Sequence, residues 1–417
     1  MRKNKQWTRL DNAAKIFPAA STKSDTKVFR FACELYEKVE QDALQRATEM
    51  TLTQFPPFQA VMKRGLFWYY LENSDIRPLV REENRPPCSS MYNRNVRTLL
   101  FEVSYFHNRI NLEVYHALTD GTGALQFLRV LVYHYLRLKH PELRDVSIQY
   151  DASFEQKMDD SFRKYYSDRK KPKKEIEKKA YQLKGARISE NRTSVIEGTM
   201  PVKSVLAKAH QKQATLTTFL AGIFLCSVGE GMAVRDRRRP VVVTVPVNLR
   251  NYFPSESVRN FFSIINVGYD FKNRIGTLED VISEVNAAFR RELTPLRLEG
   301  RLNSLGSIER NIFARITPLF IKDVVLRIAH DISAMGASVS LSNIGKVDMP
   351  EELKPYIRLF DVFVSTNKLQ ACICSFEETL TVSFTSSFVS TDIQRRFFRT
   401  LTDMGIPVEI TTNQQEE

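Results

Sequence analysis

The segment from Ile110 to Leu138 constrains the fold of this chain more than any other. Apolar residues alternate with polar ones from Ile110 to Tyr115, which is the two-residue period of a strand with one buried face. Apolar residues then recur at helical spacing from Leu125 to Leu138. The two patterns predict a strand that passes through a short turn into an amphipathic helix, as in α/β proteins.

The turn, His116-Ala117-Leu118-Thr119-Asp120-Gly121, carries residues suited to acid and base chemistry. An imidazole exchanges protons near neutral pH, because its unperturbed pKa is about 6.5. Asp120 follows the end of the strand, and Gly121 allows a positive φ or the close approach of another group. Two interpretations are open: a catalytic histidine, or a core histidine followed by an ordinary turn and helix cap.

The motif His-x-x-x-Asp-Gly, between an apolar strand and an amphipathic helix, resembles the signature of the chloramphenicol acetyltransferase-like superfamily. That superfamily includes alcohol acetyltransferases, plant acyltransferases, wax ester synthases and the condensation domains of peptide synthetases. Val241 to Arg250 and Ser338 to Gly345 resemble two later motifs of the same superfamily. The opening from Trp7 to Pro18 favours the alcohol acetyltransferase branch, whereas Tyr115 stands where many condensation domains carry a second histidine.

The resemblance implies an α/β fold of two similar domains, each a mixed sheet covered by helices, with the active-site channel between them. Residues 1–160 form the expected N-terminal domain, which carries the histidine motif. Residues 161–190 form a basic connection, and residues 191–417 form the expected C-terminal domain. The length of 417 residues agrees with two domains, because it exceeds what one hydrophobic core usually serves.

The activity implied by the resemblance is transfer of an acyl group from a coenzyme A thioester to the hydroxyl or amine of a small acceptor. Acyl-CoA is then a co-substrate, and no permanently bound cofactor is expected. Two alternatives stay open: a condensation-like enzyme with a donor bound to a carrier protein, and a binding or scaffold protein of the same fold.

The resemblance also assigns roles to residues of the three motifs. His116 would be the general base, while Asp120 and Gly121 would shape the turn and Arg250 would pair with Asp120. The alternative for Arg250 is a surface residue at a strand end. Contacts to the oxyanion or substrate are expected from the third motif, although Ser and Asn before a glycine are also common turn residues: Ser340, Ser342 and Asn343.

Cysteines and the N-terminus bear on the compartment. The five cysteines form no disulfide framework, and Cys372 and Cys374 are interpreted as buried thiols of one strand rather than half of a zinc site. No metal site is therefore predicted. Met1 to Lys5 is polar and precedes no apolar segment, which is unlike a signal peptide. We expect a cytoplasmic protein, with peripheral membrane contact left open.

The positive charge is concentrated in one stretch. Between Arg163 and Arg187 there are eleven Lys or Arg and three Asp or Glu, so this stretch carries +8 of the formal +13. Tyr165 and Tyr166 lie within it, but no nucleic-acid recognition motif accompanies them, and no nucleic-acid partner is predicted. The stretch is either a solvated connection or a site that attracts an anionic partner, such as a membrane surface or an acyl carrier protein.

Other enzyme classes lack their sequence signatures. The chain has no Gly-x-Ser-x-Gly elbow, no phosphate-binding Gly-x-x-x-x-Gly-Lys-Ser/Thr loop and no His-Glu-x-x-His zinc helix. The motifs therefore favour acyl transfer over serine hydrolase, P-loop or zinc protease chemistry.

Overall fold

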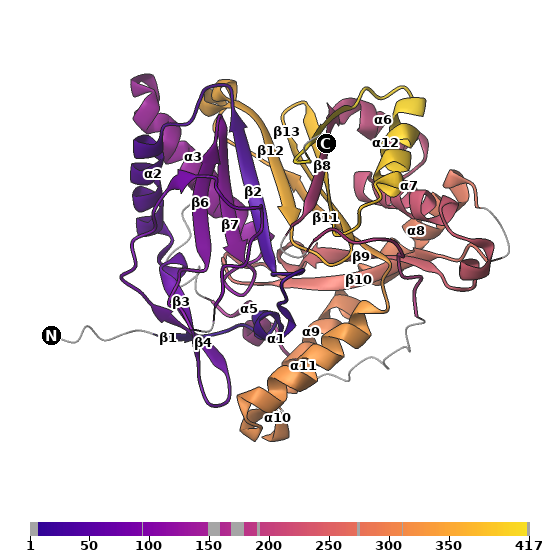
Figure 1. Ribbon diagram of the computed structural model, residues 1–417, viewed down its shortest axis with the longest axis horizontal. Coiled ribbons are helices and arrows are strands. Elements are labelled where there is room, and N and C mark those ends of the chain that lie inside the picture. The colour runs from indigo at the N-terminus through magenta and orange to yellow at the C-terminus, as the bar shows by residue number, and fades with distance from the viewer. Residues whose placement is uncertain are drawn as a thin grey trace.

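The computed structural model describes residues 7–93, 95–148, 159–167, 179–189, 192–272, 276–310 and 312–414. Within these ranges the strands form three sheets, and helices cover the outer faces of the two larger ones (Figure 1). Much of the basic stretch, residues 168–178, lies outside the described residues. No helix in the described part of the chain is long and apolar enough to span a bilayer.

The first large sheet has five strands and is built mainly by the N-terminal part of the chain. It is antiparallel except where β5 runs parallel to β6, so it is a mixed sheet. Helices α2 (Gln41–Gln54) and α3 (Gly121–Lys139) pack against each other, and α3 contacts the sheet. The strands, in order across the sheet, are β12 (Ile357–Val364), β2 (Val28–Leu35), β7 (Arg109–Tyr115), β6 (Phe101–Phe106) and β5 (Arg81–Glu82).

The second large sheet has seven strands and is also mixed, because β11 runs parallel to both of its neighbours. The strands, in order across it, are β10 (Phe262–Tyr269), β9 (Val241–Asn248), β11 (Val339–Lys346), β13 (Leu369–Phe376), β14 (Thr379–Ser386), β8 (Ser194–Pro201) and β15 (Glu409–Thr412). The helices beside it are α6 (Val202–Gln211), α7 (Leu216–Glu230), α8 (Leu278–Glu292) and α12 (Asp392–Asp403).

The third sheet is small and lies near the N-terminus. It consists of β1 (Trp7–Arg9), β4 (Tyr69–Asn73) and β3 (Ala60–Arg64), in that order. The chain turns back at Gly65, so that β3 and β4 form a hairpin. Below the sheets in Figure 1, three further helices follow one another: α9 (Pro295–Arg310), α10 (Ile312–Ile316) and α11 (Leu319–Ala334).

The predicted α/β class, with mixed sheets covered by helices, is confirmed, but one strand crosses the expected domain boundary. β12 lies between β11 and β13 in the sequence, yet it pairs antiparallel with β2 of the five-stranded sheet. Its residues are almost all buried, and the Cys374 thiol of β13 contacts the Phe360 carbonyl of β12. The division at 161–190 therefore places β12 with the C-terminal segment, whereas its hydrogen bonds place it in the N-terminal sheet.

Candidate active site

His116 is the first residue after β7, on the edge where this strand passes into the turn before α3. Its backbone N–H donates to the Lys27 carbonyl at 2.9 Å, which ties the start of the turn to β2. Asp120 is the N-cap of α3, and its carboxylate accepts from the Gly123 N–H at 3.1 Å. Strand, turn and helix therefore lie where the sequence pattern predicts them.

The imidazole of His116 lies in an aromatic environment. Its ring stacks on Phe17 with centroids 4.5 Å apart, and Phe29 approaches edge-on at 4.9 Å. Phe262, at the start of β10, lies 5.6 Å away on another side. Burial lowers the pKa of His116 below its usual value, in spite of the opposing charge of Asp120. The imidazole is therefore neutral at pH 7 and able to accept a proton.

Asn260 determines which imidazole nitrogen is free. Its side-chain N–H groups donate to Asp11 Oδ2 at 3.2 Å and to the His116 carbonyl at 3.1 Å, so its Oδ1 is the acceptor. This Oδ1 lies 3.1 Å from His116 Nδ1, which must then carry the proton. The neutral imidazole is left with its lone pair on Nε2.

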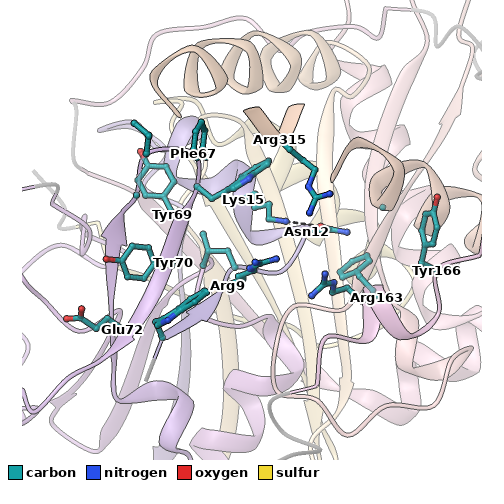
Figure 2. A pocket seen from close by; sticks show the side chains of 17 residues that line it. Arg9, Asn12, Lys15, Phe67, Tyr69, Tyr70, Glu72, Arg163, Tyr166 and Arg315 are labelled. Atoms are coloured by element: carbon teal, nitrogen blue, oxygen red, sulfur yellow. Dashed lines mark hydrogen bonds between the residues drawn. The ribbon is translucent and has the colours of Figure 1, made fainter. Parts of the chain in front are cut away.

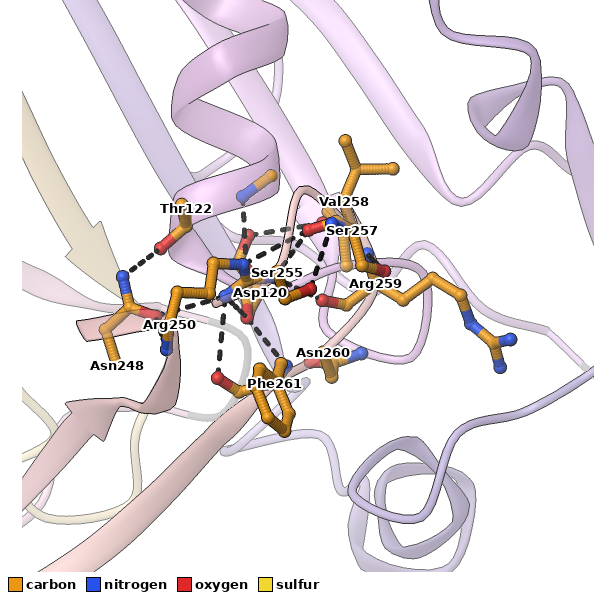
Figure 3. Close-up of polar contacts among 12 residues, drawn as sticks. Asp120, Thr122, Asn248, Arg250, Ser255, Ser257, Val258, Arg259, Asn260 and Phe261 are labelled. Carbon is orange, nitrogen blue, oxygen red and sulfur yellow. Dashed lines mark hydrogen bonds and ion pairs between the residues drawn. The ribbon is translucent and has the colours of Figure 1, made fainter. Parts of the chain in front are cut away.

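An ion pair lies directly behind the turn (Figure 3). Arg250 Nη1 donates to Asp120 Oδ2 at 2.7 Å, and both side chains are buried. The Phe261 backbone N–H donates to the same oxygen at 2.8 Å. Asp120 thus contacts a cation and two backbone donors, which compensate its removal from water. The partner expected from the sequence resemblance is the one that the structure places there.

Arg250 also holds the loop that carries Asn260. Its guanidinium donates to the Ser257 carbonyl at 2.8 Å and to the Arg259 carbonyl at 2.6 Å (Figure 3). One side chain therefore fixes the turn after β7 through Asp120 and the loop before β10 through two carbonyls. Because the loop then places Asn260 against His116, the ion pair acts on the imidazole indirectly.

Gly121 and Gly123 lie so close to neighbouring residues that a Cβ at either position would meet them. Gly121 does not have a positive φ, and the Cδ1 of Ile344 lies 3.2 Å from where its Cβ would be. The tighter position is Gly123, because a Cβ there would lie 2.3 Å from the Val258 carbonyl oxygen. Gly123 thus permits the loop with Asn260 to lie against the start of α3, a requirement that the sequence analysis did not identify.

The third motif lies on β11, which carries Ile344 to the turn. The Asn343 amide donates to Thr217 Oγ1 at 2.8 Å, and its carbonyl oxygen accepts from the Gly345 N–H at 2.9 Å. This side chain therefore already holds neighbouring protein groups. Ser340 and Ser342 lie on the same strand, in register with Gln370 and Cys372 of β13, and both are partly exposed.

Asp11 and Asn260 were missed by the sequence analysis. Burial raises the pKa of Asp11 to about 6, while the nearby Arg259 lowers it. Asp11 Oδ1 accepts from the Ala14 N–H at 2.7 Å, and Asp11 Oδ2 accepts from Asn260. No local pattern marks either residue, because they lie 249 positions apart and only the fold brings them together.

Comparison with known proteins defines the class of fold. No family model and no curated protein matches the sequence. The structure of TRI3 trichothecene 15-O-acetyltransferase from Fusarium sporotrichioides matches with a TM-score of 0.64 and 10% identity, over 96% of this chain and 94% of that one. TRI101 of F. graminearum, solved with coenzyme A and deoxynivalenol, matches with a TM-score of 0.65 and 11% identity, over 97% and 99%.

A third match comes from a peptide synthetase. The first condensation domain of the CDA synthetase has a TM-score of 0.61 and 13% identity, over 95% of each chain. The chain therefore has the chloramphenicol acetyltransferase-like acyltransferase fold, which acetyltransferases and condensation domains share. This result confirms the resemblance that the three sequence motifs indicated.

Proposed function

We propose that this protein is an acyltransferase that moves an acyl group from a coenzyme A thioester to a hydroxyl or amine of a small acceptor. The observation that carries the proposal is the contact of Asn260 with His116 Nδ1, which leaves Nε2 as the base of an imidazole whose pKa is lowered by burial. The fold supports it, because the matching acetyltransferase of F. graminearum was solved with coenzyme A.

The proposed reaction has one addition and one elimination step. His116 Nε2 takes the proton of the acceptor hydroxyl or amine as this group attacks the thioester carbonyl. The tetrahedral oxyanion then collapses, the carbon–sulfur bond breaks, and the imidazolium returns the proton to the thiolate. Every proton is accounted for by the one imidazole, so neither a covalent enzyme intermediate nor a metal ion is required.

Asp120, Gly121 and Arg250 have positioning roles in this proposal. The ion pair of Asp120 and Arg250 fixes the turn that follows His116 and the loop that carries Asn260. Hydrogen-bond donors are also needed for the oxyanion, and we propose the Ser340 and Ser342 hydroxyls of β11 for this role. Asn343 is the third proposed donor, but its amide would have to leave Thr217.

A carrier-bound donor is the second proposed function, because a condensation domain shares the fold. The basic segment 163–187 would attract an acidic carrier protein. We place either reaction in the cytoplasm, since all five cysteines are free thiols. The assay must also distinguish both enzymes from a binding or scaffold protein that has no activity.

The test is thiol release by the full chain, with acetyl-CoA and longer acyl-CoA donors and a panel of alcohols and amines. Turnover that His116→Ala abolishes supports the proposal. Turnover with acyl carrier donors alone selects the condensation-like function. Thiol release that is equal in the wild type and in a folded His116→Ala variant contradicts the assigned base. If neither kind of donor gives turnover, both enzyme functions are rejected and the scaffold is the remaining interpretation.

A further inference from the structure

A cavity of about 920 Å³ lies between the small N-terminal sheet and helices α5 (Ser161–Lys164), α9 and α10 (Figure 2). This volume is within the range of small-molecule sites, which is about 300–1,000 Å³. Neither His116 nor any other residue assigned above to acyl transfer lines the cavity. The proposed reaction therefore assigns no role to this cavity, although its size suits a small ligand.

Three guanidinium groups point into the cavity from different elements. Arg9 comes from β1, Arg163 from α5 and Arg315 from α10, and Figure 2 shows them converging. Within the described ranges, none of the three side chains has a hydrogen bond or ion pair with another residue. Arg30, Arg109 and Arg250, by contrast, all bind carboxylates.

The net charge of the cavity is positive. Lys15 adds a fourth cation, and its Nζ lies 3.1 Å from Asn12 Oδ1. Glu72 is the acidic residue among those that line the cavity, and it lies 3.6 Å from Arg97 outside it. Like charges gathered in one cavity repel each other, and a bound anion relieves this repulsion. Guanidinium groups bind carboxylates, sulfonates and phosphates through paired hydrogen bonds.

Aromatic side chains form another part of the wall. Trp7, Phe67 and Tyr70 line the cavity, and Trp7 packs edge-on against Tyr70 with centroids 6.3 Å apart. Trp7 is 60% exposed and Phe67 is 39% exposed, which leaves ring surface for a ligand. Flat aromatic surface beside guanidinium groups favours a ligand with a planar ring and an anionic group.

The cavity is connected to the candidate active site by one short segment. Leu10, Asn12 and Lys15 face the cavity, whereas Asp11 binds Asn260 and Phe17 stacks on His116. A ligand on one side of this segment therefore lies one layer of residues from the imidazole.

We propose that this cavity binds an organic anion that carries a planar aromatic group. Arg9, Arg163 and Arg315 hold the anionic group, and the ring lies against Trp7, Phe67 and Tyr70. Two kinds of molecule have this chemistry: the nucleotide portion of a coenzyme A thioester, and an aromatic acid. Binding does not require the proposed acyl transfer, so it is tested without turnover.

The experiment is calorimetric titration of the full chain with 2-naphthyl phosphate, and with 2-naphthol as the uncharged match. We expect the phosphate to bind at least roughly tenfold more tightly, because each charge-assisted hydrogen bond commonly changes affinity by about that factor. The double variant, which carries Arg9→Gln and Arg315→Gln, should lose the preference for 2-naphthyl phosphate over 2-naphthol. Equal affinity for the two probes, or an unchanged preference in the double variant, overturns the proposal.

Two controls separate this site from folding and from catalysis. Arg290→Gln removes an exposed arginine of α8 that does not line the cavity, and leaves the affinity unchanged. His116→Ala also keeps the affinity, so binding and acyl transfer succeed or fail independently. Thermal unfolding shows that the double variant is folded, since neither arginine side chain has a hydrogen bond or ion pair to lose among the described residues.

Competition identifies the natural ligand class. Displacement of 2-naphthyl phosphate by coenzyme A supports the proposal with the nucleotide as the ligand. Displacement by 2-naphthoate but not by coenzyme A supports it with an aromatic acid as the ligand. Binding that neither compound displaces shows that the probe lies elsewhere, and overturns the proposal.

Discussion

The side chains of Asp120 and Asp361 are both buried where the two large sheets meet, but they have different partners. Asp120 accepts from Arg250 and from two backbone N–H groups. Asp361, on β12, accepts at Oδ1 from Ser383 and from the Val362 N–H, while its Oδ2 is buried without a hydrogen-bond partner among the described residues.

The difference lies in which carboxyl group the nearest arginine binds. Arg109 donates to both oxygens of Glu197, at 2.8 and 2.7 Å, and lowers the pKa of that group against the effect of its burial. Burial and the charge of Glu197 instead raise the pKa of Asp361 well above its usual value. Asp120 thus has a cation beside it and orders a loop, whereas burial and the neighbouring Glu197 favour the protonated form of Asp361.

The largest expected effect is the loss of turnover in a variant of His116, compared with a variant of Arg109 that affects stability alone. His116→Ala should lower turnover by about 10²–10⁴-fold, because it removes the proposed base, while the protein stays folded. Arg109 lies outside the candidate site. Arg109→Met should therefore lower the midpoint of thermal unfolding but keep the turnover per folded molecule. Thiol release and thermal unfolding measure both variants. Wild-type turnover in His116→Ala would reject the base.

The next effect concerns the charged pair. Arg250→Met leaves Asp120 buried without its cation, which commonly costs about 3–5 kcal/mol of unfolding free energy. Asp120→Asn should also destabilise, and the double variant should be less damaged than the sum of the two by about 0.5–3 kcal/mol. Denaturant unfolding of the four proteins gives the coupling. Strict additivity would show that the contact contributes nothing.

A smaller effect is expected at Asn260. Asn260→Ala removes the acceptor at His116 Nδ1, and turnover should fall by about 3- to 10-fold, the worth of one neutral hydrogen bond. The base must be neutral, so kcat/KM should fall as the pH drops through the lowered pKa of His116. Since Asn260 raises this pKa, the variant's acid limb should move to lower pH.

A control is needed for the pH profile, because Asp11 titrates nearby. Its pKa is raised to about 6, and it contacts the same asparagine. Asp11→Asn, measured in parallel, should keep an acid limb if His116 is the base. Because Asn260 lowers the pKa of Asp11, an acid limb that disappears in Asp11→Asn and moves to higher pH in Asn260→Ala would assign the titration to Asp11 instead.

The smallest effect is expected at Asp361. Because folding raises the pKa of Asp361, its protonated form stabilises the folded state. This stabilisation is fully present below the unfolded pKa of about 3.9 and is lost as the pH rises through the folded pKa. Asp361→Asn cannot ionise, so its unfolding midpoint at pH 7 should equal or exceed that of the wild type. The difference should shrink towards pH 4. A strong loss at pH 7, like that of Asp120→Asn, would show that Asp361 is charged.

Local sequence determined the elements that carry the motif. Alternation over β7, the Asp120 cap and helical spacing in α3 specify strand, turn and helix within one short segment. Thr215 likewise caps α7, with its hydroxyl accepting from the Thr218 N–H. Such patterns are readable because the residues that satisfy each backbone group are a few positions apart.

Tertiary structure decided which distant residues complete the site. The pairing of β12 with β2, the contact of Asn260 with His116, and the gathering of Arg9, Arg163 and Arg315 around one cavity all join residues far apart in the sequence. No local period encodes these contacts, because they follow from which sheet edges are free and which loops pack together. The sequence by itself thus determined the class of fold and the proposed base, whereas only the fold decided the orientation of the imidazole and the charge of its surroundings.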